Sequence, residues 1–186
     1  MATNVTTDRV WFRFPCDRIK NSERRGCSLI KKIISTAIVL LMMVLIFLFS
    51  AQPGDRSDET SLSVGGVIGQ IFISDFEQWT PEEQFAFAER INHPVRKLAH
   101  ATEYAVLGGL VAAMFGAYGL RGWLRLGVAW GCTALYACTD EFHQLFVPGR
   151  SGQLADVLID SSGALAGVLL CLLVAAIWTR IKGRKA

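Results

Sequence analysis

Polar and ionisable side chains in this sequence gather beside long apolar runs, and several stand at helical spacing. Lys97, His100 and Glu103 follow one another at intervals of three residues, which predicts one narrow face at the start of a helix. A second polar group closes the next apolar run, and a turn rich in Pro and Gly at 147–152 leads to a third. These groups consist of Asp140, Glu141, His143 and Gln144, then Arg150 in the turn, then Asp156 and Asp160 one helical turn apart.

These residue types permit three kinds of chemistry, and the sequence leaves the choice open. Histidines and carboxylates together could hold a divalent metal, although nothing requires one and the cofactor stays unknown. They could also act as a general acid and base, or cationic side chains could bind an anionic headgroup. We predict catalytic roles for Glu103, Glu141, His100 and His143, and ligand binding by Lys97, Gln144, Arg150, Asp156, Gln52 and Asp160.

A purely structural role is the alternative for this polar set. Buried charges in a small bundle can pair with one another and hold the register of the helices. On this interpretation Arg150 pairs with Asp156 or Glu141, and Lys97 pairs with Glu103. We expect the remaining histidine, His93, to lie in a loop.

The apolar runs predict the elements that position these residues. The fold class is an all-α membrane protein, a bundle of four transmembrane helices with amphipathic helices on its outer face. Since a span needs roughly 20 apolar residues, we place spans at about 29–50, 97–119, 124–146 and 156–179. At about 1.5 Å per residue, the polar groups of all four spans stand roughly 24–30 Å from the basic residues at the inner ends. They therefore share one layer at the outer face.

The distribution of charge predicts the orientation. Basic residues precede the first run, flank the second connection and follow the last run, whereas the segment at 51–96 is rich in acids. We therefore expect a cytoplasmic basic segment (1–28), a membrane domain (29–180) with an extracytoplasmic segment (51–96), and a cytoplasmic tail (181–186). The basic ends favour membrane lipids as partners, and nucleic acid is excluded because no separate basic domain exists.

The extracytoplasmic segment contains two further helix signals. Val64, Val67, Ile68, Ile71 and Phe72 recur at helical spacing, which predicts an amphipathic helix on the outer surface. Thr80-Pro81-Glu82-Glu83 has the pattern of a capping box with Pro in the first turn. It predicts a second short helix that runs towards Asn92-His93-Pro94. We expect both helices to cover the outer mouth of the bundle.

Glycine pairs predict where helices of the bundle pack closely, and the cysteine pattern indicates no cross-links. Two Gly-x-x-x-Gly pairs, Gly127/Gly131 and Gly163/Gly167, predict ordinary packing seams between helices. The cysteine count of 5 is odd and no CxxC pair is present, so neither a disulfide framework nor a structural zinc site is expected.

Several of these stretches together resemble the VanZ-like membrane proteins. The matching stretches are 49–54, 96–104, 140–150, 156–160 and 163–167, and they cover most of the chain from about residue 40 onward. One departure is Asp160, where the pattern often has Asn. The resemblance implies a bacterial cell-membrane protein. It also implies a link to teicoplanin resistance, the property of the family's name-giving member, but it supplies no catalytic mechanism.

The expected function combines the polar layer with this resemblance. We expect the protein to bind or modify a lipid-linked cell-envelope component, such as a cell-wall precursor, at an outward-facing site. Whether it is an enzyme is left open. The alternatives are a non-enzymatic accessory protein whose polar cluster only fixes helix packing, and a small transporter. The transporter is disfavoured because four short helices without an inverted repeat leave little room for alternating access.

Overall fold

The computed structural model describes residues 21–183, which are helical outside the short connections. Five α-helices and one 3₁₀ helix follow in the order α1 Asn21–Ser50, α2 Gly54–Phe72, η2 Phe76–Gln78, α3 Pro81–Ala117, α4 Gly122–Gln144 and α5 Leu154–Gly183. The described part of the chain contains no strand, so the predicted all-α class is confirmed. Most of the basic N-terminal segment (1–20) and the end of the tail (184–186) lie outside the described residues.

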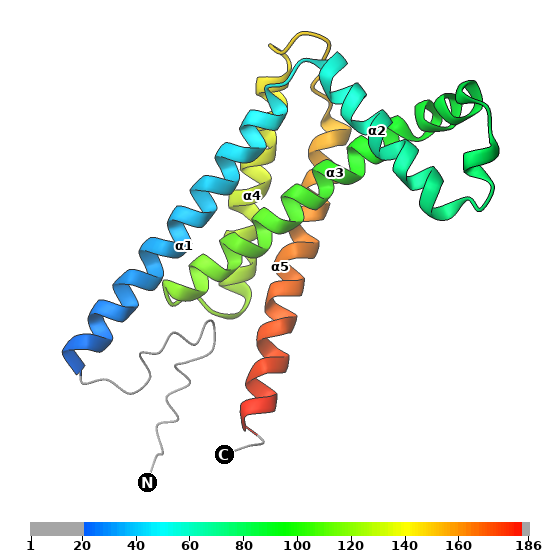
Figure 1. Ribbon diagram of the computed structural model, residues 1–186. Coiled ribbons are helices and arrows are strands. Elements are labelled where there is room, and N and C mark those ends of the chain that lie inside the picture. Colours follow the sequence, from blue (N-terminus) through cyan, green and yellow to red (C-terminus); the bar gives the residue numbers. More distant parts are fainter. Residues whose placement is uncertain (1–20, 184–186) are drawn as a thin grey trace.

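Three helical segments are long and apolar enough to cross a membrane. They are Ser28–Ser50 in α1, all of α3 and all of α5. At about 1.5 Å per residue, α4 is also roughly 35 Å long, but it carries Arg125, Asp140 and Glu141. It contacts α1, α3 and α5 in the bundle (Figure 1). Length and composition therefore support three spans, and the predicted fourth is not confirmed by them.

The α3–α5 crossing is the closest backbone approach of the bundle. Gly163 lies against the backbone of Ala101, and Gly167 against that of Ala105, so any side chain there would collide. Small residues allow membrane helices to approach this closely, and the predicted seam at Gly163/Gly167 is confirmed. The other predicted seam is wrong within this chain, because nothing in the described residues lies within 4 Å of a Cβ placed on Gly127 or Gly131.

A lateral arm, made of α2, η2 and the first turns of α3, projects sideways from the bundle (Figure 1). The predicted capping box is present, since the Thr80 side chain accepts from the Glu83 N–H and Glu83 accepts from the Thr80 N–H. However, α3 continues through Pro94, so the predicted separate short helix is wrong and His93 is helical. Proline removes one backbone donor, and on either side of Pro94 the side chains of Asn92 and Arg96 bind Asp58 of α2.

The packing of the arm differs from the expected amphipathic arrangement. The buried face of α2 is its small one, Gly54, Ser61, Gly65 and Gly69. Gly65 lies against Ala88 of α3, and Gly69 against the ring of Phe76. The large apolar residues are exposed instead, with Ile71 at 69% and Phe72 at 79%. Only the first turns of α2 border the polar end of the bundle, and the rest extends to the side.

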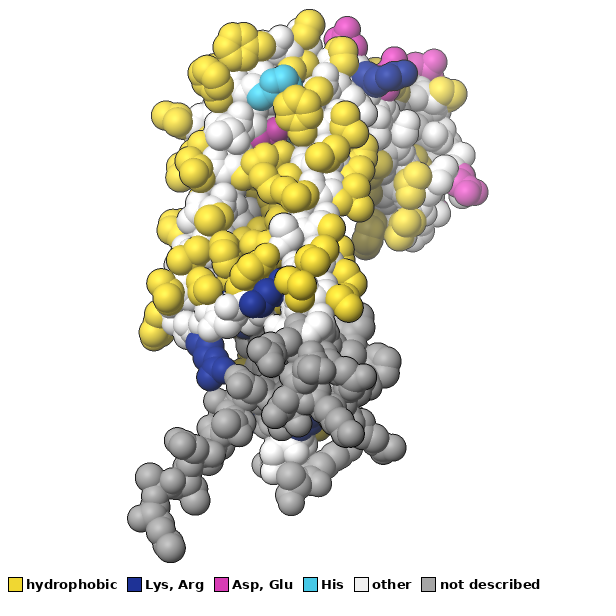
Figure 2. All heavy atoms as spheres, turned by 90° about the vertical axis from the view of Figure 1, so that its left-hand side faces the viewer, with side chains coloured by type: hydrophobic (Ala, Val, Ile, Leu, Met, Phe, Trp, Pro, Cys, Tyr) yellow, Lys and Arg dark blue, Asp and Glu magenta, His cyan; other side chains and the backbone are white. Residues whose placement is uncertain are grey.

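The side of the bundle is apolar, and the charged groups lie near its ends. Figure 2 shows one face on which hydrophobic side chains cover most of the surface, whereas acidic groups gather at the upper end and on the arm. The upper end is where α1 ends and α5 begins (Figure 1). We call it the polar end.

Candidate functional site

The connection between α4 and α5 reaches across the polar end to the start of α2. Gly149 in this loop has φ 73°, a left-handed conformation that favours glycine. The Gly54 N–H donates to the Pro148 carbonyl at 3.0 Å. A Cβ on Gly54 would collide with the backbone of Gly149, so two glycines permit this contact. The contact holds the next residue of the loop, Arg150, beside the end of α1.

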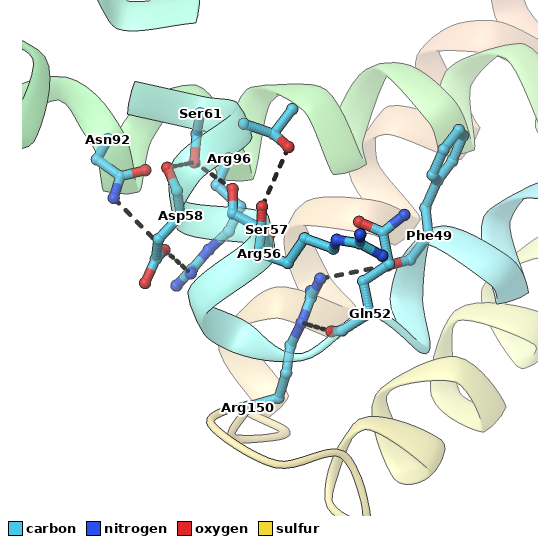
Figure 3. A network of polar contacts seen from close by, with 10 residues as sticks. Phe49, Gln52, Arg56, Ser57, Asp58, Ser61, Asn92, Arg96 and Arg150 are labelled. Atoms are coloured by element: carbon cyan, nitrogen blue, oxygen red, sulfur yellow. Dashed lines mark hydrogen bonds and ion pairs between the residues drawn. The ribbon is translucent and has the colours of Figure 1, made fainter. Parts of the chain in front are cut away.

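Arg150 binds backbone carbonyls rather than carboxylates. Its Nε donates to the carbonyl of Gln52 at 3.1 Å, and its Nη2 donates to that of Phe49 at 3.3 Å (Figure 3). Burial, and then the nearby Arg96, lowers the pKa of the Arg150 guanidinium, which still stays protonated in a protein. Among the described residues Arg150 forms no ion pair, so the predicted pairing with Asp156 or Glu141 is wrong.

A separate network ties the arm to the bundle beside Arg150. Arg96 Nη1 donates to Asp58 Oδ1 at 2.7 Å, and Asn92 Nδ2 lies 3.4 Å from the same oxygen (Figure 3). Asp58 belongs to α2, and both partners belong to α3. The Arg96 cation is therefore neutralised within the protein, in contrast to that of Arg150.

The polar end encloses a small cavity, which we call the polar cavity, of about 60 Å³. Three helices and the α4–α5 loop line it. The lining residues are His93, Arg96, Lys97 and His100 of α3, Glu141 and Gln144 of α4, Gly149, Arg150, Ser151 and Gln153 of the loop, and Asp156, Ile159 and Asp160 of α5. Seven of the ten predicted site residues thus line one cavity: Lys97, His100, Glu141, Gln144, Arg150, Asp156 and Asp160.

Pairing inside the cavity differs from the prediction. Lys97 Nζ lies 2.6 Å from Asp156 Oδ1, so Lys97 pairs with α5 and not with Glu103. Each step of three residues falls about 60° short of a full helical turn, so Glu103 is rotated by about 120° from Lys97. The expected single narrow face is therefore wrong. Glu103 instead lines a space shared with α1 and α2. Its Oε2 lies 3.8 Å from Nδ1 of His100, which belongs to the same helix, α3.

A second opening, which we call the lateral cleft, adjoins the polar cavity. It has a volume of about 280 Å³ and lies between the end of α1, the start of α2 and α3. Its lining includes Phe49 and Gln52, the apolar Val64 and Val95, and Glu103. Arg96, His100 and Arg150 line both spaces. Arg150 therefore borders both the lateral cleft and the polar cavity.

Buried hydrogen bonds support the floor of the site. Ser50 Oγ donates to Asp140 Oδ2 at 2.6 Å, and Gln144 Nε2 donates to Ser50 Oγ at 3.0 Å. Glu141 accepts a hydrogen bond from the Gln153 N–H at 3.0 Å, which ties the loop to α4. These contacts join the end of α1 to the end of α4 and hold the cavity wall in place.

A protein-family model described as VanZ/LLP1 matches residues 35–175. The chain belongs to the VanZ/LLP1 family. The resemblance predicted from the motifs is thereby confirmed, and with the three apolar helices it makes the chain a membrane protein. Both the polar cavity and the lateral cleft lie inside the matched range. No curated protein and no solved structure matches the chain.

Three predicted site residues of this VanZ/LLP1 protein lie elsewhere than expected. The ring of His143 packs on Phe47 with the centroids 4.6 Å apart, and His143 lines neither space. Gln52 and Glu103 line the lateral cleft rather than the polar cavity. Within residues 21–183, no group of three His, Cys, Asp or Glu side chains is arranged to hold a metal ion.

Other residues of the site were missed in the sequence. Ser50 and Asp140 are buried, at 0% and 2% exposure, and Arg96 lines both spaces. Asp140 stood in the polar group at the end of α4, so its neighbours were a signal for it. Ser50 carried no signal, because a serine at the end of an apolar run is an ordinary surface residue until a partner is known.

Proposed function

We propose that this VanZ/LLP1 protein binds the phosphate-bearing headgroup of a lipid-linked cell-envelope component in the polar cavity. The supporting observation is Arg150, a cation that binds only backbone carbonyls within residues 21–183 and borders both the cavity and the cleft. A guanidinium recognises phosphate through charge-assisted hydrogen bonds, and Arg150 has no internal carboxylate to displace. Arg96 and Lys97 are neutralised by partners and would add a positive field rather than a direct contact.

The proposed placement is multi-pass, in a bacterial cell membrane, with both termini cytoplasmic. The first turns of α1 and the last turns of α5 lie at the same end of the bundle (Figure 1), as four crossings require. That end carries Lys31, Lys32, Arg121, Arg180 and Lys182, which favours the cytoplasmic side. The polar end then faces outward, where lipid-linked cell-wall precursors are exposed.

The lateral cleft offers a route from the outer leaflet to Arg150. Its walls combine apolar side chains with the polar ends of α1 and α3, which suits an amphiphile whose chains stay in the bilayer. The exposed apolar face of α2 would then rest in the interfacial layer beside the entrance, as amphipathic helices do.

A catalytic version of this function has one supporting observation. His100 and Glu103 lie 3.8 Å apart at the junction of the two spaces, a spacing that allows proton transfer after a small adjustment. In this version Glu103 or Glu141 is the base and Arg150 holds the phosphate. Turnover of a lipid-linked precursor by the purified protein, lost in Glu103→Gln or Glu141→Gln, would support it.

The binding proposal is tested with the full chain purified in detergent and titrated with phosphatidylglycerol, with diacylglycerol as the phosphate-free comparison. Bound lipid is counted by native mass spectrometry. Arg150→Gln removes the charge but leaves an amide that can still donate to the Gln52 carbonyl. A charged hydrogen bond contributes about 1.5–3 kcal/mol, so the affinity for phosphatidylglycerol should fall by roughly 10- to 100-fold.

The matched control is Arg180→Gln, which removes an exposed cation at the other end of α5. It should leave the affinity for phosphatidylglycerol unchanged. Equal binding of phosphatidylglycerol and diacylglycerol, or equal losses in the two variants, would contradict the proposal.

A further inference from the structure

Asp160 is an acidic group of the polar cavity whose carboxyl has no hydrogen-bond partner within residues 21–183. It lines the cavity and is 1% exposed. Neither of its carboxyl oxygens accepts a hydrogen bond from the described residues. A buried polar group left without a partner costs about 1–3 kcal/mol, and more when it is charged. A ligand that donates hydrogen bonds to it would remove this cost.

The neighbours of Asp160 narrow the kind of ligand group. The carboxyl groups of Glu141 of α4 and Asp156 of α5 line the same cavity as Asp160. Two other cations that line the cavity, Arg96 and Lys97, are paired with Asp58 and Asp156. The surroundings of Asp160 therefore favour a positive charge, whereas Arg150 on the same cavity favours a negative one.

The size of the cavity limits the ligand group further. One water molecule needs about 10–15 Å³ on this scale, so about 60 Å³ holds four to six small heavy atoms. An aminoethyl group has three heavy atoms and fits within this space, and its ammonium offers three N–H donors. A trimethylammonioethyl group has six heavy atoms, the upper limit of this range, and its ammonium has no N–H to donate to a carboxylate.

We propose, on the basis of the headgroup-binding function above, that the polar cavity recognises an amphiphile whose headgroup carries both a phosphate and a primary ammonium. The phosphate binds Arg150 at the junction with the lateral cleft. The ammonium enters the polar cavity and donates to Asp160. The headgroup thus supplies a phosphate to Arg150 and hydrogen-bond donors to the Asp160 carboxyl, which has no partner among the described residues, and the acyl or prenyl chain leaves through the cleft.

The test measures binding of three phospholipids with equal acyl chains to the full-length protein in detergent. All three carry the phosphate. Phosphatidylethanolamine adds a primary ammonium, phosphatidylcholine adds a quaternary ammonium, and phosphatidylglycerol adds no ammonium. The wild type should bind phosphatidylethanolamine about tenfold more tightly than either, because only its ammonium donates to a buried carboxylate. Asp160→Asn, which keeps the shape of the side chain, should reduce this preference to about twofold or less.

The control variant is Ser162→Ala, an exposed residue of α5 whose hydroxyl bonds only its own helix. It should keep the wild-type preference. Equal affinity of the wild type for all three lipids, with Arg150→Gln weakening them all, would overturn amine recognition and leave phosphate binding intact. Absence of binding to any of them would overturn both proposals. A preference that disappears with EDTA would assign Asp160 to a divalent cation and overturn the ammonium.

Discussion

Arg125 and Arg150 lie near opposite ends of α4, and they show that one residue type can serve two different purposes. Arg125, in the first turn, is 4% exposed, and its Nε donates to the Ala112 carbonyl at 2.7 Å. Its guanidinium lies over Gly116 and contacts Cys171 Sγ at 3.6 Å. Arg150, in the loop six residues after the end of α4, also donates to backbone carbonyls, but it borders two open spaces.

The difference between these arginines lies in what surrounds the charge. Arg125 is enclosed by α3, α4 and α5, so its side chain holds helices together at the end opposite the site. Arg150 faces a cavity that is also lined by Asp160, a buried carboxyl without a hydrogen-bond partner in the described part of the chain. A buried arginine alone is therefore weak evidence for a ligand site. An arginine on a cavity with a second unsatisfied group is stronger evidence.

The largest effect is expected on drug susceptibility in cells. We expect a variant at Arg150 to lose function at a normal protein level, and a variant at Arg125 to lower the protein level. In a teicoplanin-sensitive Gram-positive host in which the wild type lowers susceptibility, Arg150→Gln at wild-type membrane levels should return susceptibility to that of cells without the protein. Arg125→Met should reduce protection only in proportion to its lower membrane level. Drug susceptibility and immunoblots of membranes measure both. If cells with Arg150→Gln at the wild-type membrane level were as resistant as cells with the wild type, the proposed role of Arg150 in ligand binding would be contradicted.

The free energy of unfolding should show the opposite order, with a larger loss at Arg125 than at Arg150. Arg125→Met removes the buried donor to the Ala112 carbonyl, and the free energy of unfolding should fall by about 2 kcal/mol. Arg150→Gln keeps an amide donor near the Gln52 carbonyl and should cost less than about 1 kcal/mol. Unfolding of the purified variants in mixed micelles, followed by circular dichroism, measures the two values. A larger loss for Arg150→Gln would mean that Arg150 mainly holds the loop.

A smaller effect is expected for Lys97, a cation on the same cavity that already has a partner. Lys97→Met should weaken phosphatidylglycerol binding by about threefold, less than Arg150→Gln, because partly exposed ion pairs contribute about 0.2–1 kcal/mol. The double variant Lys97→Met/Asp156→Asn removes the stranded carboxylate and should recover most of this loss. A loss as large as that of Arg150→Gln would place the phosphate at Lys97.

The smallest effect is expected for His143, whose ring packs on Phe47 outside both spaces. His143→Ala should leave lipid affinity unchanged and lower the free energy of unfolding by about 0.5–1.5 kcal/mol through the lost ring contact. The same titrations and unfolding curves measure it. Loss of lipid binding would return His143 to the site, as the sequence alone predicted.

Much of the architecture follows from local features that a sequence displays directly. The apolar runs match α1, the second half of α3, α4 and α5, because hydrophobicity summed over about 20 residues decides where a membrane helix forms. The capping box at Thr80 and the seam at Gly163 and Gly167 are also local patterns. Counting residues along helices placed the polar groups in one layer, and seven of ten predicted residues line one cavity.

Only the tertiary structure decided which of these groups are paired and which are free. Lys97 meets Asp156 rather than Glu103, and Arg150 meets carbonyls rather than acids, because pairing depends on helix rotation and loop path. A rotation of about 120° between positions six residues apart separates side chains that a sequence places together. The small face of α2 is buried because close backbone packing against α3 needs small residues. Partners are set by distances across the bundle, and no local pattern in the sequence encodes those distances.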